Sequence, residues 1–145
     1  MYYAKTEATM NLDDLKAYIL ESGIKDKIEL LGEVDNMKTF YRDLDIFILP
    51  SIQPEPFGLV VIEAMNNKLP VVATNHGGPV EIIENNIDGF LVDYKNAKEM
   101  AQVVNKLIKD KELRSYITTN AEKKVKEQFN VSRYVDEISC ILEEF

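Results

Sequence analysis

The sequence predicts an α/β domain with a parallel sheet flanked by helices, and two observations lead to this prediction. Short segments rich in apolar residues alternate along the chain with longer segments of helical periodicity. Several short segments are apolar at every position, which is typical of parallel strands that are buried on both faces. With 145 residues, 46% of them hydrophobic, the chain is expected to form a single domain (residues 1–145) with a substantial core.

The N-terminal third predicts a helix, a strand and a second, shorter helix. Asn11 can cap a helix over residues 12–22, and Gly23 can end it. Residues 28–31 contain three apolar residues and predict a strand. Residues 36–43 predict one or two helical turns.

The middle of the chain continues the alternation of strands and helices. Residues 46–49 form an apolar segment that Pro50 ends, so we expect a strand there. Residues 58–67 predict an apolar helix, and residues 71–73 predict a second buried strand. A proline is favoured at the first helical position, so a short helix is expected at residues 79–83.

The C-terminal part predicts one more strand, at residues 90–92, followed only by helices. Asn96 and Glu99 have the spacing of a capping box, which marks the start of the first of these helices. The three helices are expected at residues 96–109, 111–128 and 132–144.

Composition and charge argue against several classes of function. The net charge is −8 and basic residues are not clustered, which argues against binding to nucleic acid. The single cysteine, Cys140, cannot form an internal disulfide and fits a reducing compartment. The sequence shows no signal peptide and no apolar run of membrane-spanning length. A cytoplasmic location is therefore expected, with peripheral association with a membrane left open for a longer parent enzyme.

The predicted sheet also indicates where a ligand would bind. In open parallel sheets, ligands bind beyond the carboxyl ends of the strands. The loops that follow Leu31, Leu49 and Ala73 are therefore the expected location of a site.

The helix that begins at Gly58 is suited to binding a phosphate group. Its first backbone N–H groups, near Gly58, Leu59 and Val60, have no acceptor inside the helix, and the helix end carries partial positive charge. Glu63 lies five residues further on, or about 7.5 Å along the axis at ~1.5 Å per residue. A ribose attached to a diphosphate would lie beside it, and a carboxylate can accept hydrogen bonds from two neighbouring hydroxyls.

A second carboxylate, Glu55, precedes this helix between Pro54 and Pro56. It lies where a group beyond the diphosphate would be expected. The alternatives are that Glu63 pairs with a buried Lys or Arg, and that Glu55 is an exposed loop acid.

Glu55 and Glu63 are separated by seven residues, and this segment closely resembles that of retaining glycosyltransferases of the GT-B fold, glycosyltransferase family 4. The resemblance extends over about residues 12–145 and implies the C-terminal, nucleotide-sugar-binding half of such an enzyme. Five blocks carry it in the order and spacing of the family: residues 45–51, 55–65, 70–74, 77–83 and 88–92.

The resemblance also implies roles for individual residues. Glu55 would be the catalytic residue and would contact hydroxyls of the donor sugar, with help from the backbone amides of Phe57 and Gly58. The amides of Leu59 and Val60 would hold the distal phosphate.

Glu63 would bind the ribose hydroxyls, and the loop of Gly32, Glu33 and Val34 would lie near the base. The donor would be a nucleoside-diphosphate sugar and the acceptor a hydroxyl group.

Neither a metal nor another cofactor is expected. Asp43 and Asp45 match the metal-binding Asp-x-Asp pattern of the other glycosyltransferase fold, but Asp45 opens a predicted strand instead of lying in a ligand loop. The resemblance to GT-B enzymes implies that the leaving group is stabilised without a bound metal.

The sequence also departs from the family pattern. The first βα unit, the Gly-Arg and Lys-Gly blocks that neutralise the diphosphate, and the N-terminal acceptor domain have no counterpart in these residues. We therefore expect a truncated domain that is inactive alone and prone to self-association, with residues 1–10 as the tail of an incomplete strand or a cloning remnant. Lys68 stands where the family often has glycine, and because Asn67 tolerates a left-handed conformation, this departure is expected to cost little.

The loop after residue 73 contains the only histidine, His76, which is expected to be structural, and Gly77 and Gly78, which are expected to serve a tight turn. Two alternatives to a transferase remain open at this point. One is half of a sugar-nucleotide epimerase, and the other is a non-catalytic nucleotide-sugar-binding domain.

Overall fold

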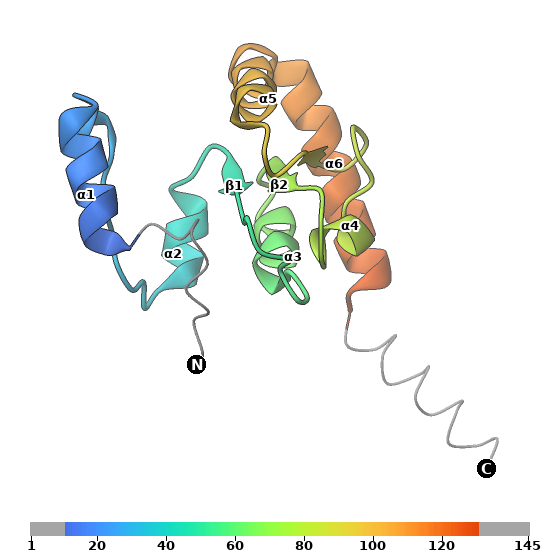
Figure 1. The fold of residues 1–145 in the computed structure, drawn as a ribbon. Coiled ribbons are helices and arrows are strands. Elements are labelled where there is room, and N and C mark those ends of the chain that lie inside the picture. Colours follow the sequence, from blue (N-terminus) through green and yellow to red (C-terminus); the bar gives the residue numbers. More distant parts are fainter. Residues whose placement is uncertain (1–10, 131–145) are drawn as a thin grey trace. The chain divides into compact units, whose positions relative to one another are not determined.

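The computed structural model describes residues 11–130. The chain divides into two compact units, Met1–Asp35 and Asn36–Phe145, which are described separately (Figure 1). The helix predicted at residues 132–144, Cys140 and the segment 1–10 lie outside the described residues.

The first unit contains helix α1 (Leu12–Glu21) and the 3-10 turn η1 (Lys25–Lys27). The predicted cap of α1 is confirmed, because Asn11 Oδ1 accepts a hydrogen bond of 2.9 Å from the Asp14 amide. The strand predicted at residues 28–31 is wrong. A strand needs ladder hydrogen bonds to a neighbour, and within residues 11–130 the only ladders join other segments.

The second unit has the predicted α/β fold, in which three parallel strands are flanked by helices. The sheet order is β1-β2-β3, with Phe47 opposite Val71 and Val72 opposite Phe90. Each predicted element in residues 36–128 is confirmed to within one or two residues at its ends. The elements are α2 (Met37–Arg42), β1 (Phe47–Leu49), α3 (Leu59–Asn66), β2 (Val71–Thr74), α4 (Pro79–Ile82), β3 (Phe90–Val92), α5 (Ala97–Lys109) and α6 (Lys111–Gln128).

Strand β2 is buried along its whole length because helices cover both faces of the sheet. Val71 and Ala73 belong to a core cluster with residues of α3, α4 and the C-terminal half of α6. Val72 points to the opposite face and joins a second cluster with Leu107 of α5 and Ile117 of α6. Helices α3 and α5 thus lie on opposite sides of the strands, and α6 contacts both (Figure 1).

The loop before β3 is fastened to α6 by a buried ion pair. Asp88, with 4% of its side chain exposed, accepts a hydrogen bond of 2.7 Å from the Lys124 ammonium. Its other oxygen accepts one of 2.7 Å from the Glu84 amide, and the Asn120 side chain donates to Ile87 O at 3.0 Å. These contacts place β3 and its preceding turn against the middle of α6.

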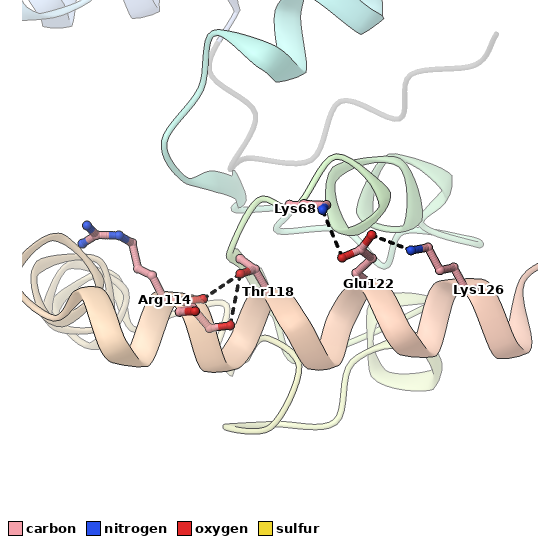
Figure 2. A network of polar contacts seen from close by, with 6 residues as sticks. Lys68, Arg114, Thr118, Glu122 and Lys126 are labelled. Carbon is pink, nitrogen blue, oxygen red and sulfur yellow. Dashed lines mark hydrogen bonds and ion pairs between the residues drawn. The ribbon is translucent and has the colours of Figure 1, made fainter.

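The turn between α3 and β2 corrects one expectation. Lys68 itself adopts the left-handed conformation (φ +59), whereas Asn67 has φ −88. The Lys68 ammonium lies 3.3 Å from Glu122 on α6, and Glu122 also pairs with Lys126 (Figure 2). A non-glycine residue in the left-handed region is strained by about 1–2 kcal/mol. Lys68 bears this strain and also forms the exposed ion pair with Glu122.

Candidate functional site

The loops that follow β1 and β2 lie against one another at the carboxyl end of the sheet. Thr74 Oγ1 donates a hydrogen bond of 2.9 Å to Ser51 O, and His76 Nε2 lies 2.9 Å from Ile52 O. The amide of Gly78 donates one of 2.6 Å to Glu55 O. The segment that carries Glu55 is therefore held by three contacts, one from the last residue of β2 and two from the residues that follow it.

Gly77 and Gly78 permit this contact, because each brings backbone against backbone. A Cβ on Gly77 would lie 2.4 Å from Glu55 O, and a Cβ on Gly78 would lie 2.1 Å from Phe57 O. Gly77 also has φ +67, which disfavours other residues. The expectation of a tight turn therefore missed their main role, which is the close approach of two segments far apart in sequence.

The start of α3 has the geometry that a bound anion needs. Gly58 is its N-cap in the left-handed conformation (φ 84, ψ 34), and the helix begins at Leu59. The amides of Leu59 and Val60 have no acceptor inside the helix, whereas the Val61 amide donates a hydrogen bond of 2.8 Å to Gly58 O. Leu59 is 60% exposed, whereas Gly58 is buried, with Pro79 and Ile82 beside the position that a Cβ on Gly58 would take.

Glu63 lies on α3 with its carboxylate exposed and oriented by a tyrosine. The Tyr41 hydroxyl donates a hydrogen bond of 2.9 Å to Glu63 Oε2. Burial of Tyr41, with smaller contributions from Glu63, raises the pKa of its phenol well above the ordinary value, so the hydroxyl keeps its proton and remains a donor. Tyr41 was missed in the sequence, since no spacing rule connects α2 with α3.

The alternative in which Glu63 pairs with a buried Lys or Arg is not what the structure shows. Within residues 11–130 Glu63 forms no ion pair. The carboxylate instead lines a cavity of about 330 Å³ between α3 and the end of α6, with Lys126 and Phe129 on the opposite wall. A carboxylate oriented by a neutral donor at an open cavity keeps acceptor capacity for a ligand.

Glu55 is half-buried, and its backbone is fixed by the pairing with Gly77 and by the Gly78 amide. Its side chain forms no hydrogen bond or ion pair with the part of the chain that the structure describes. Glu55 and Glu63 thus flank the start of α3, one before it and one within it.

Comparison with known proteins identifies the family. The family model described as "Glycosyl transferases group 1" matches residues 10–124. The chain belongs to the group 1 glycosyltransferases. A relative in Methanocaldococcus jannaschii, described as an uncharacterised glycosyltransferase, is 37% identical over 120 residues, which cover 81% of this chain and 30% of the relative.

Solved structures agree with this assignment to the group 1 glycosyltransferases. The crystal structure of Anabaena HepE in complex with UDP matches with a TM-score of 0.87 at 29% identity, over 92% of this chain and 37% of HepE. HepE in complex with UDP-glucose matches with a TM-score of 0.85 over the same shares. The fold is therefore that of the C-terminal half of a GT-B glycosyltransferase.

This group 1 glycosyltransferase chain spans about a third of the length of the curated relatives that it matches. The loop predicted to lie near the base of the nucleotide, Gly32, Glu33 and Val34, belongs to the first unit. Its role stays a prediction. Among the described residues, no helix is both long and apolar enough to cross a membrane.

Proposed function

We propose that the chain is the donor-binding domain of a retaining glycosyltransferase of family 4, which transfers a sugar from a nucleoside-diphosphate sugar to an acceptor hydroxyl. The observation that carries this proposal is the geometry around α3. A helix start with a left-handed Gly58 is followed on the same helix by Glu63, exposed and oriented by Tyr41. The complexes of HepE with UDP and UDP-glucose support a uridine-diphosphate sugar as the donor.

In this proposal the chain holds the donor mainly through its backbone and two carboxylates. The amides at the start of α3, including those of Leu59 and Val60, bind the diphosphate and stabilise the negative charge that grows on it as the sugar leaves. Glu63 binds the ribose hydroxyls. Glu55, with the amides of Phe57 and Gly58, holds the donor sugar.

No metal is required for these roles, and no side chain of the site is placed as a covalent nucleophile. Transfer on the face of the sugar that the diphosphate leaves would retain the anomeric configuration. The leaving-group oxygen would then take the proton of the acceptor hydroxyl.

Glu63→Gln and Glu55→Gln variants separate the two carboxylates. Glu63→Gln keeps an acceptor for the Tyr41 hydroxyl but loses the charge. It should therefore lower the affinity for both UDP and UDP-glucose about tenfold. Glu55→Gln should lower the affinity for UDP-glucose by about the same factor and leave the affinity for UDP unchanged. NMR titration of the chain with each ligand measures both affinities.

Glu112→Gln is the matched control, because Glu112 is an exposed carboxylate at the start of α6. It should bind both ligands like the unmodified chain. Equal losses of affinity for UDP and UDP-glucose in the Glu55 variant would show that Glu55 does not bind the sugar. Unchanged UDP binding in a folded Glu63 variant would leave Glu63 with a structural role only.

A further inference from the structure

His76 makes a specific contact that the proposed roles do not use. Its Nε2 atom lies 2.9 Å from the Ile52 carbonyl oxygen, which can only accept a hydrogen bond, so Nε2 carries the hydrogen. Its Nδ1 atom is hidden from solvent and has no hydrogen-bond partner among the described residues. A hydrogen on Nδ1 would therefore lack an acceptor, which favours the tautomer with hydrogen on Nε2 alone.

The His76 ring is supported from the loop after β3. It lies against Tyr94, with ring centroids 5.0 Å apart and planes tilted by 31°. Lys95 Nζ lies 5.1 Å from the centre of the Tyr94 ring. His76 therefore joins the loops that follow all three strands of the sheet.

A hydrogen bond to the Ile52 carbonyl restrains the backbone close to Glu55, because Ile52 lies three residues before it. Ile52 is 54% exposed, so packing of its side chain contributes little to fixing the segment. The neighbouring fixed points are Ser51 O, bound by Thr74, and Glu55 O, bound by the Gly78 amide. His76 supplies the contact between these two.

We propose that His76 is a positioning residue for the donor sugar. By donating to Ile52 O, it fixes the path of the backbone into Glu55 and so the position of the Glu55 carboxylate. This inference rests on the proposed function, since it takes Glu55 as the residue that holds the sugar. Glu63 is carried by α3, which His76 does not contact through any described hydrogen bond, so the effect is specific to the sugar end of the donor.

Two variants separate the donated hydrogen bond from the ring. His76→Phe keeps a ring against Tyr94 and removes the donor, whereas His76→Gln removes the ring and keeps an N–H donor. NMR titration of the chain should show that His76→Phe lowers the affinity for UDP-glucose about three- to tenfold and changes the affinity for UDP by less than about twofold. His76→Gln should recover most of the loss.

Equal weakening of UDP and UDP-glucose by His76→Phe, or no weakening of either, would overturn the positioning role. If the unmodified chain bound UDP-glucose and lost affinity on Glu55→Gln but not on His76→Phe, this inference would fail while the proposed function stood. If the unmodified chain bound neither ligand, the proposed function would fail, and this inference with it.

A ligand-free measurement covers the case in which His76→Phe does not fold. Long-range proton–nitrogen NMR spectra of the unmodified chain report which ring nitrogen carries hydrogen. The expected result is hydrogen on Nε2, and hydrogen on Nδ1 alone would overturn the contact with Ile52 O.

Discussion

Replacement of Lys124 with Met is expected to lower the free energy of unfolding by about 3–5 kcal/mol, because it leaves a buried carboxylate without its cation. The Asp88 side chain is 4% exposed and that of Lys124 is 16% exposed, and their charged atoms are 2.7 Å apart. After the substitution the Glu84 amide is the remaining hydrogen-bond donor to the Asp88 side chain among the described residues. Urea denaturation followed by circular dichroism measures the loss.

Lys123→Met is the matched control for this prediction. Lys123 is the preceding residue of α6, but its side chain is 71% exposed and its ammonium lies 4.0 Å from Glu127. Its replacement should cost less than about 1 kcal/mol. The double variant Asp88→Asn/Lys124→Met should recover part of the loss, since neither charge remains. Similar losses for Lys123→Met and Lys124→Met would show that the Asp88–Lys124 pair does not stabilise the fold.

Replacement of Gly77 with Ala is expected to cost about 3 kcal/mol or more of unfolding free energy and to weaken UDP-glucose binding. The new Cβ would lie 2.4 Å from Glu55 O and 2.7 Å from Glu55 N. Both atoms are backbone and cannot rotate away, so the segment that carries Glu55 must move. The cost adds to the strain of alanine in the left-handed region, since Gly77 has φ +67.

Gly23→Ala separates these two contributions. Gly23 has nearly the same conformation (φ +66), but a Cβ there would meet no atom within 4 Å. Its replacement should therefore show the conformational strain alone, about 1–2 kcal/mol. Denaturation curves that give Gly77→Ala and Gly23→Ala the same loss would refute the close approach of the two loops.

The sequence predicted the elements of the second unit well, because local signals and tertiary structure agree there. Strand β2 is apolar at Val71, Val72 and Ala73 because both faces are covered, and Asn96 caps α5 as the Glu99 spacing indicated. The strand at residues 28–31 was predicted wrongly because apolarity marks a segment suited to a sheet but does not supply a partner strand.

The parts of the site that lie on a single helix could be predicted from the sequence. The contacts between segments that are distant in sequence could not. The start of α3 and the position of Glu63 follow from spacing along a single helix. Tyr41, which orients Glu63, and His76, which holds Ile52 O, act across 22 and 24 residues of sequence. Helix α2 contributes Tyr41 and α3 contributes Glu63, whereas His76 and Ile52 lie in loops beyond the sheet. Only tertiary packing brings such residues together, and no pattern in one sequence records it.

Backbone amide NMR of the chain during titration with UDP-glucose tests the central claim most directly. If the start of α3 binds the diphosphate, the largest shifts should fall on the amides of Gly58, Leu59 and Val60, with a second group at Glu63 and Glu55. Amides of α5, such as that of Leu107 on the other face of the sheet, should remain unshifted. Shifts concentrated on α5, or none at all at millimolar UDP-glucose, would contradict the assignment of this chain as a donor-binding domain.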